Sequence, residues 1–401
     1  MESASNATPM LESAALLIGG AFVVVSLSVR LGVPAILGFL LTGLVLGPHV
    51  LGLLQEEGAA LGALGELGVI LLMFSLGLTF SWTKLVELRR LIFGIGGAQV
   101  GITAVIVALG ANLLLDVSWP KAILLGAATA MSSTALSIKQ LEASGALGHA
   151  QGRTSIAILL FQDLATVGFL VLIDALQTAS ATGHGVEKGF FNVLGLFAAL
   201  ILARKLLIPL AQWIERSSNN ELPQLLALFL VLSTAVGAHY AGLSPALGAF
   251  IAGMLIGEGD ARNVVEREVR PFRDLLLGIF FVSLGAQMDI TILGQAFGSV
   301  LAWLAVIVFL KAAILAAILY LADTDAEVSA KVALILAHAG EFSLLLVSLS
   351  VGAGLLDNAL AQPFLLAIGI SLFIAPLLIS LSARENLVRQ SLCKLRRNQG
   401  R

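Results

Sequence analysis

The chain has 401 residues, of which 58% are hydrophobic and 12% are charged. Soluble domains carry about 25% charged residues, and a mean hydropathy of +0.99 indicates a chain that lies mostly within a bilayer. This composition excludes a soluble enzyme, a nucleic-acid-binding protein and a receptor with a single anchor. The single cysteine, Cys393, excludes an internal disulfide framework and any cysteine-based metal site.

Apolar runs between charged or Gly/Pro-rich breaks predict an all-α polytopic membrane protein with thirteen transmembrane helices. A helix that crosses the hydrocarbon core needs about 20 mainly apolar residues. The start of the chain lacks the basic region of a signal peptide, so we expect the first helix to remain. The predicted spans are 11–29, 34–53, 59–79, 91–115, 119–138, 154–176, 189–214, 222–240, 244–257, 272–288, 292–322, 329–350 and 360–383.

The positive charges predict the orientation of these spans. With the N-terminus outside and thirteen alternating helices, the inner side receives all but three of the 23 Lys and Arg residues. Lys121 and Lys188 fall outside, and Lys311 falls within a helix. Cytoplasmic loops of membrane proteins carry such an excess of Lys and Arg. We therefore expect an outside N-terminus and a cytoplasmic C-terminus.

Two glycine-rich segments indicate an internal repeat. At an offset of 210, five residues of the segment 32–47 match residues of the segment 242–257, and a Ser-Leu-Gly string at 75–77 recurs at 283–285. These offsets relate helices 1–6 to helices 8–13, with helix 7 as the connector. A single connecting helix inverts the second unit relative to the first, and inverted repeats are typical of secondary transporters. A chance similarity between glycine-rich apolar helices is the alternative.

Two charged residues are predicted deep within spans, where charge is costly and commonly functional. Asp163 lies about 10 residues into helix 6, or roughly 15 Å deep at 1.5 Å per residue. Lys311 is similarly deep in helix 11. Either residue could instead hold helices together, and the lysine could simply neutralise a carboxylate. Asp163 is the better candidate for binding a transported ion.

Polar segments interrupt helices 5 and 12 at corresponding places of the two predicted repeats. Helix 5 contains Met131-Ser-Ser-Thr134, and helix 12 contains His338-Ala-Gly-Glu341. Broken helices direct free backbone groups into a cavity and can hold ions there. Glu341 could be a site carboxylate, a partner of Lys311 or a partner of the amides at a break. We expect His338 to be a hydrogen-bonded structural histidine.

Sequence motifs of three other functions are incomplete or absent. Gly257-Glu-Gly-Asp260 matches a string of intramembrane aspartyl proteases, but neither tyrosine of the chain precedes the second aspartate that those enzymes need. The chain has no phosphate-binding Walker loop and no Thr-Val-Gly-Tyr-Gly filter of potassium channels. We expect a transporter that is not an enzyme and needs no cofactor.

Several strings resemble the Kef-type branch of the monovalent cation:proton antiporter-2 family. They are Leu37-Gly-Phe-Leu-Leu-Thr-Gly43 with Gly47-Pro48, Ser132-Ser-Thr-Ala135, Phe161-Gln-Asp163, Pro271-Phe272 and Gly340-Glu-Phe342. The resemblance covers about residues 10–383. It implies an inverted-repeat antiporter with interrupted helices 5 and 12, and a homodimer. It also implies that Asp163 binds both the cation and the proton and that Lys311 is a charge-compensating lysine.

The resemblance leads to an expected site and domain organisation. We expect a transmembrane antiporter domain over 1–383 and a short basic cytosolic tail over 384–401, without the nucleotide-binding domain that usually follows in Kef-type proteins. A separate regulatory subunit could replace that domain, but no residue supports one. The expected cation- and proton-binding residues are Asp163, Gln162, Ser132, Ser133 and Thr134, with Lys311 and Glu341 compensating charge.

The expected function is exchange of a monovalent cation for H⁺ across the inner membrane by alternating access. Gln162 stands where electrogenic sodium relatives have an acid, which favours K⁺. The alternatives are a Na⁺/H⁺ antiporter of the same fold, a cation pathway without proton coupling and a symporter for an organic anion. The lone buried carboxylate argues against the symporter.

Overall fold

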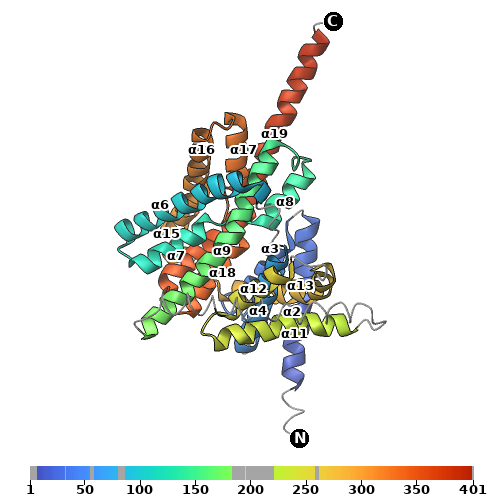
Figure 1. The fold of residues 1–401 in the computed structure, drawn as a ribbon, viewed down its shortest axis with the longest axis vertical. Helices are drawn as coiled ribbons and strands as arrows, with labels where there is room; N and C mark the ends of the chain where they lie inside the picture. Colours follow the sequence, from blue (N-terminus) through green and yellow to red (C-terminus); the bar gives the residue numbers. More distant parts are fainter. Residues whose placement is uncertain are drawn as a thin grey trace. The chain divides into compact units, whose positions relative to one another are not determined.

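The structure is a computed structural model that describes residues 7–31, 33–54, 58–79, 86–182, 195, 221–257 and 262–399. In this part of the chain all regular elements are helices (Figure 1). The chain divides into two compact units: unit 1 comprises residues 1–87 and 167–289, and unit 2 comprises residues 88–166 and 290–401. The helix expected at 189–214 lies outside the described residues.

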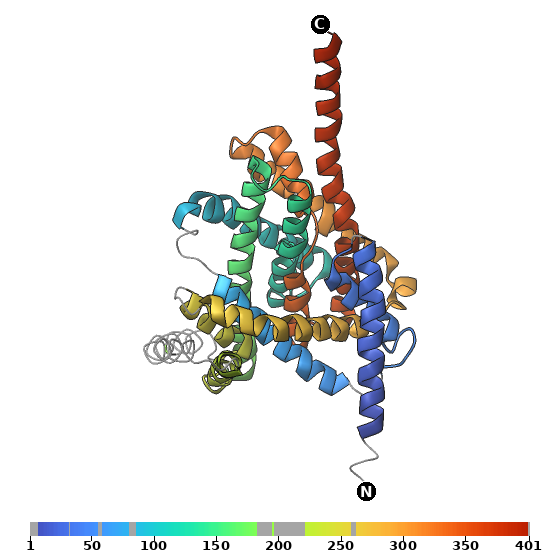
Figure 2. The same ribbon diagram turned by 90° about the vertical axis from the view of Figure 1, so that its right-hand side faces the viewer.

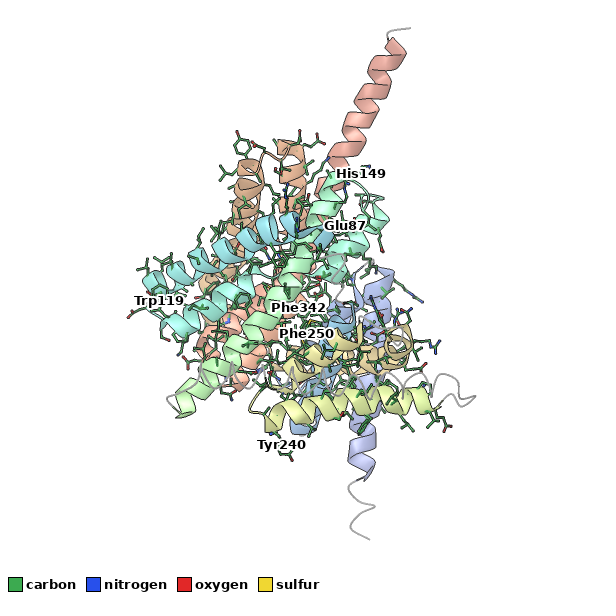
Figure 3. All side chains as sticks on the ribbon, viewed as in Figure 1. Glu87, Trp119, His149, Tyr240, Phe250 and Phe342 are labelled. Atoms are coloured by element: carbon green, nitrogen blue, oxygen red, sulfur yellow. The ribbon has the colours of Figure 1, made fainter. Side chains whose placement is uncertain are left out.

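The described part of unit 1 contains six helices and the second half of α9. Helices α12 and α13 both lie against α4, and α13 also lies against α3 (Figures 1 and 2). Tyr240 ends α11 and is 86% exposed, whereas Phe250 of α12 is buried (Figure 3). The helices are α2 (Ala7–Arg30), α3 (Ala35–Leu46), α4 (Gly58–Thr79), α11 (Glu221–Tyr240), α12 (Pro245–Gly257) and α13 (Arg262–Gln287).

Glycines allow the backbones of unit 1 to approach closely. A Cβ atom on Gly43 of α3 would lie 1.9 Å from the carbonyl oxygen of Val282 in α13, and one on Gly253 of α12 would lie 2.1 Å from that of Phe74 in α4. Small residues commonly occupy such helix contacts in membranes. The two contacts are related by the offsets of the predicted repeat, 210 for the glycines and 208 for their partners.

Two helix boundaries in unit 1 differ from the expected spans. Helix α13 begins at Arg262, ten residues before the expected start at 272, and contains Pro271 in its interior. Pairs spaced by four residues, Arg262–Glu266 and Arg270–Asp274, support this polar first half, which hydropathy alone does not detect. Helix α3 ends at Leu46 instead of 53. Asp260 of the rejected protease motif lies outside the described residues.

Unit 2 contains the interrupted helices. Trp119 lies at the start of α7, and Phe342 is buried in the first turn of α18 (Figure 3). Helix α19 continues to Gln399, past the end expected at 383. The helices are η1 (Arg90–Gly96), α6 (Gly97–Leu115), α7 (Trp119–Ala130), α8 (Thr134–Ala143), the first half of α9 (Ala150–Thr182), α14 (Ile292–Gln295), α15 (Phe297–Ala305), η2 (Val306–Leu310), α16 (Lys311–Leu321), α17 (Ala326–Leu336), α18 (Glu341–Gly352) and α19 (Asn358–Gln399).

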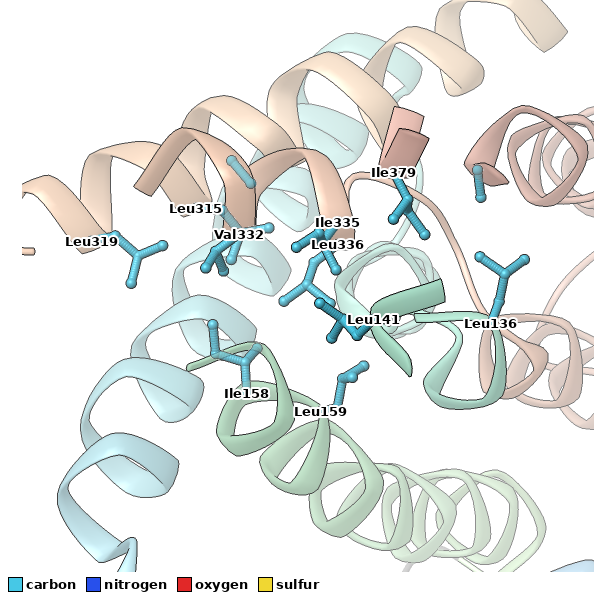
Figure 4. Packing of buried hydrophobic residues seen from close by; sticks show 12 residues of the cluster. Leu136, Leu141, Ile158, Leu159, Leu315, Leu319, Val332, Ile335, Leu336 and Ile379 are labelled. Atoms are coloured by element: carbon cyan, nitrogen blue, oxygen red, sulfur yellow. The ribbon is translucent and has the colours of Figure 1, made fainter. Parts of the chain in front are cut away.

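A buried apolar cluster joins five helices of unit 2 beside the interruptions. Leu136 follows the start of α8, and Leu336 is the last residue of α17. Side chains of α9, α16 and α19 complete the cluster (Figure 4). Its burial gives the two broken helices a common packed support. The labelled residues are Leu136, Leu141, Ile158, Leu159, Leu315, Leu319, Val332, Ile335, Leu336 and Ile379.

The described helices confirm a multi-pass membrane protein. Seven are long and apolar enough to cross a membrane, or eight if α17 and α18, bent by 45°, form one span. Three shorter apolar helices occur at Ala14–Arg30, Ala35–Leu46 and Pro245–Gly257. The count of thirteen spans, the inverted repeat and the orientation stay predictions.

Candidate functional site

The interruptions expected in helices 5 and 12 are both present in unit 2. Helix α7 ends at Ala130, Met131 is extended with ψ 144°, and α8 begins at Thr134. The hydroxyl of Ser133 accepts the N–H of Leu136 at 3.3 Å and caps α8. Helix α17 ends at Leu336, and α18 begins at Glu341. Each interruption therefore places the carbonyl end of one helix near the amide end of the next.

The two interrupted segments contact each other through their backbones. A Cβ atom on Gly340 would lie 2.5 Å from the carbonyl carbon of Ser132, so this crossing requires glycine. The hydroxyl of Ser132 donates to the carbonyl of Leu336 at 3.0 Å, and that of Ser343 donates to Met131 at 3.4 Å. These bonds satisfy carbonyls at the ends of α7 and α17, which otherwise lack helical partners.

Asp163 lies in the middle of α9 beside the amide end of α8. Its side chain is half-buried, and its Oδ1 accepts the hydroxyl of Thr134 at 3.0 Å. Thr134 is the first residue of α8. A carboxylate is stabilised at a helix N-terminus, where unpaired amides carry partial positive charge. The structure thus brings together Asp163 and Thr134, two of the expected site residues.

Glu341 reaches the same helix end from the opposite interruption. Its carboxylate lies beside the Ser133 hydroxyl and the N–H groups of Thr134 and Ala135 and interacts with them electrostatically. It also interacts electrostatically with Asp163. Its Oε2 atom is buried and has no hydrogen-bond partner. Contact with the amides at a break was one of the three roles considered for Glu341, and the carboxylate lies beside those amides.

Lys311 binds the opposite, carbonyl ends of the broken helices. The side chain is fully buried, and Nζ donates to the carbonyls of Met131 at 2.6 Å and His338 at 2.9 Å. These oxygens lie at or just past the C-termini of α7 and α17, which carry partial negative charge. Lys311 directly follows the π-helical turn η2, a feature that is frequent at functional sites. Both hydrogen bonds of Lys311 thus go to backbone, and neither goes to Glu341.

Gln162 and Ser132 face a different part of the interruption from Asp163. Gln162 is buried, and its Oε1 accepts the N–H of Ser132 at 2.8 Å. Its Nε2 donates to Oε1 of Gln99 at 2.7 Å, and Gln99 donates to the carbonyl of Ala130 at 3.1 Å. Successive residues of a helix point about 100° apart because a turn holds 3.6 residues. The amide of Gln162 therefore holds the break, while Asp163 lies beside Thr134.

Sequence reasoning missed Gln99 and Ser371, which also hold the interruptions. Gln99 lies in the apolar run of α6, and its buried amide in that run is a signal that could have identified it. Ser371 of α19 accepts the N–H of Ala339 at 3.1 Å. His338 contacts the carbonyl of Ala339 at 2.7 Å and the hydroxyl of Ser137 at 3.3 Å. These contacts fit the structural role expected for His338.

Comparisons with known proteins find similarity over most of the chain. A sequence model described as "Sodium/hydrogen exchanger, transmembrane" matches residues 15–384. The "Putative K(+) efflux antiporter KefB" of Alkalimonas amylolytica is 36% identical over 368 residues, which are 90% of this chain and 55% of that protein. The chain therefore spans about half the length of this curated relative.

Two solved structures of the sodium proton antiporter MjNhaP1 from Methanocaldococcus jannaschii share the fold. The structure at pH 8 has a TM-score of 0.67 and 19% identity, and covers 94% of this chain and 96% of that chain. The electron microscopy structure has a TM-score of 0.58 and 18% identity, with 94% and 95% covered. At these identities the likeness establishes the fold alone.

Proposed function

This chain belongs to the transmembrane sodium/hydrogen exchanger family, whose members are cation/proton antiporters and not enzymes, and we propose that it exchanges K⁺ for H⁺ at Asp163. The family assignment and the KefB relative confirm the resemblance found in the sequence. The chain is thus a multi-pass membrane transporter. The cation, the site and the mechanism are the parts that we propose.

The observation that carries the proposal is the position of Asp163 at an interruption. Asp163 is a half-buried carboxylate in the middle of a span, bonded to the hydroxyl of Thr134 at the amide end of α8. Protonated Asp163 has no charge to hold a cation, whereas ionised Asp163 can bind one with hydroxyl oxygens of Thr134 and Ser133. Proton and cation therefore compete for one group, and alternating access to the two sides of the membrane turns this competition into exchange.

The remaining polar groups hold the interruption in shape. The positive charge of Lys311 compensates the partial negative charge at the carbonyl ends of α7 and α17. We infer that Lys311 stays charged through the transport cycle. Gln162, Gln99 and Ser132 form a hydrogen-bonded chain behind Asp163. We therefore assign to Gln162 and Ser132 a positioning role, in place of the direct cation contact expected from the sequence.

Hydrogen bonds in unit 2 support the inverted repeat as part of this proposal. Gln99 donates to the carbonyl of Ala130, and Lys311 donates to that of His338. The two acceptors differ by 208 positions and the two donors by 212, close to the offsets found in the glycine-rich segments. Both donors also follow a π-helical turn, η1 or η2. Equivalent side chains would thus hold equivalent breaks.

K⁺ is proposed over Na⁺ on two grounds. The KefB relative is named for K⁺ efflux, and Gln162 leaves Asp163 without an acidic neighbour in sequence. The family description names sodium, and MjNhaP1 is described as a sodium proton antiporter, so a Na⁺/H⁺ antiporter is the alternative. A cation pathway without proton coupling would use the same polar groups but would move no protons.

A dye assay in reconstituted vesicles tests these proposals. With a proton gradient imposed, addition of K⁺, Na⁺ or Li⁺ should release protons, and K⁺ should act at the lowest concentration. Asp163→Asn should abolish this release. Asp174→Asn is the matched control on the same helix, because Asp174 accepts the N–H of Ser244 in unit 1 and an asparagine oxygen can still accept it. Release of protons by Asp163→Asn at the unmodified rate would contradict the assignment.

The cellular setting follows from the charge distribution. We propose that the N-terminus lies outside and the C-terminus in the cytoplasm, since Lys and Arg gather on the predicted inner side. The inner-membrane location and the homodimer are proposed from the resemblance to the Kef-type branch. The transmembrane domain is proposed to cover residues 1–383. Its proposed ligands are the transported monovalent cation and the proton.

A further inference from the structure

Two carboxylates that are far apart in the sequence meet at one helix end in unit 2. The hydroxyl of Thr134 donates to Asp163, and the Glu341 carboxylate interacts electrostatically with the N–H of the same residue. Asp163 comes from α9, and Glu341 opens α18. Asp163 therefore has a neutral neighbour in sequence, Gln162, but an acidic neighbour in space.

We propose that Glu341 is a second anionic ligand of the transported cation and that it shares one proton with Asp163 when the cation is absent. This inference rests on the proposed function and names a group that the exchange needs in addition to Asp163. The site would then offer a dehydrated monovalent cation one oxygen of each carboxylate and the hydroxyls of Thr134 and Ser133. Oxygen donors of this kind suit hard cations.

The unpartnered oxygen of Glu341 is the observation that separates this role from helix capping. The Glu341 carboxylate lies beside Ser133, Thr134 and Ala135, yet its Oε2 is buried without a hydrogen-bond partner. A buried polar atom without a hydrogen bond is energetically costly, so each one calls for an explanation. A cation or a shared proton would satisfy Oε2. Capping of α8 alone would leave this oxygen unexplained.

Charge balance explains how such a pair could exchange one proton for one cation. Two neighbouring buried carboxylates with a single positive charge, Lys311, at the same crossing favour a state in which they hold one proton between them and carry one negative charge. When the proton leaves and a monovalent cation enters, two ionised carboxylates and the cation again carry one negative charge. The positive charge of Lys311 balances the pair in both states. The exchange is therefore one-for-one and moves no net charge.

The titratable groups around the crossing are few in the described part of unit 2. They are Asp163 on α9, Lys311 on α16, and His338 and Glu341 on the segment that opens α18. Helices α6 and α7 face the crossing with the amide of Gln99 and with backbone carbonyls. Helices α6 and α7 therefore add no further acid to the pair.

Substitution by glutamine separates cation binding from capping. In Glu341→Gln the amide oxygen can still lie beside Ser133 and the start of α8, but the second negative charge is gone. We expect the K⁺ concentration for half-maximal exchange to rise about tenfold, equivalent to about 1.4 kcal/mol. The acidic pH that halves the rate should fall, because Asp163 loses the neighbour with which it shares a proton. Glu341→Asp should lie between this variant and the unmodified protein.

A matched control and a second readout make each outcome decisive. Glu142→Gln removes an exposed carboxylate at the other end of α8 and should change neither quantity. If Glu341→Gln keeps the unmodified K⁺ dependence and pH profile while Asp163→Asn is inactive, Glu341 only caps α8 and the inference is wrong. If Asp163→Asn is active, the proposed function itself fails.

Loss of all transport by Glu341→Gln would move the test to the purified protein. A cation that binds only the folded state raises its thermal stability by an amount that grows with the ratio of the cation concentration to the dissociation constant. We expect K⁺ to stabilise the unmodified protein and Glu142→Gln at the same concentrations. Glu341→Gln should need about tenfold more K⁺ for the same shift, the concentration ratio that equals about 1.4 kcal/mol. Equal K⁺ dependence in Glu341→Gln would overturn the inference.

Discussion

Replacing Gln99 by leucine tests whether the hydrogen-bonded chain behind Asp163 holds the interruption of helix 5 in shape. Leucine has a similar volume but no polar atom. Gln99 joins two groups, because it donates to the carbonyl of Ala130 and accepts from Nε2 of Gln162. The substitution removes both bonds and leaves two buried groups to find other partners. Gln162 would then be free to turn away from the N–H of Ser132.

The magnitude follows from those two bonds. Side-chain hydrogen bonds in membrane proteins contribute about 0.6 kcal/mol on average and up to about 1.7 kcal/mol. Two lost bonds therefore lower the free energy of unfolding by about 1–3 kcal/mol. Thr103→Val removes a longer contact of Gln99, at 3.3 Å, and leaves the bond to Ala130 intact. This control should cost less than half as much.

The assay is reversible unfolding in mixed micelles, combined with K⁺/H⁺ exchange in vesicles. We expect Gln99→Leu to lose stability in the stated range and to exchange more slowly at saturating K⁺. The slower rate would come from a displaced interruption of helix 5 and not from a lost cation ligand. The K⁺ concentration for half-maximal exchange should therefore change less than it does in Glu341→Gln. Unchanged stability together with unchanged exchange would refute the positioning role of Gln99.

Four further results are expected. Lys311→Met should leave two buried carbonyls without a hydrogen-bond donor and stop exchange, while Lys311→Arg should retain part of it. An imposed membrane potential should not drive exchange by the unmodified protein. If a potential pumps protons when leak is excluded, a second charge moves. Gly253→Ala should lower the yield of folded protein because its Cβ would meet Phe74 at 2.1 Å, whereas Gly237→Ala has open space and should not. A cysteine at Arg267 should react with a membrane-impermeant reagent only from the cytoplasmic side, and labelling from outside would contradict the orientation.

Much of the fold could be predicted because hydropathy and helix breakers act locally. The interruptions were predictable from Ser132-Ser-Thr134 and Gly340, since small and polar residues in an apolar run disfavour a continuous helix. The early start of α13 was not, because its first half is stabilised by ion pairs such as Arg262–Glu266, and these leave hydropathy low. Apolar periodicity therefore finds membrane segments better than it finds their polar extensions.

The site was predicted in part. Asp163 and Lys311 stood out because buried charge is rare, and the sequence alone could identify them. Which groups they contact depends on how two broken helices cross, which no local pattern specifies. The sequence therefore could not distinguish a Lys311–Glu341 pair from the observed separation, in which Lys311 binds carbonyl ends and Glu341 lies beside the amide end of α8. Gln162 was grouped with Asp163 by adjacency, although the helix turns its side chain towards Gln99.

The most direct test of the exchange mechanism is the pH of half-maximal exchange measured over a range of K⁺ concentrations in reconstituted vesicles. If one proton and one K⁺ compete for the carboxylates at Asp163, mass action requires each tenfold increase in K⁺ to move that pH by about one unit towards acid. A shift of about half a unit would mean that two protons compete with each cation. A pH of half-maximal exchange that does not move with K⁺ would contradict the competition on which the mechanism depends.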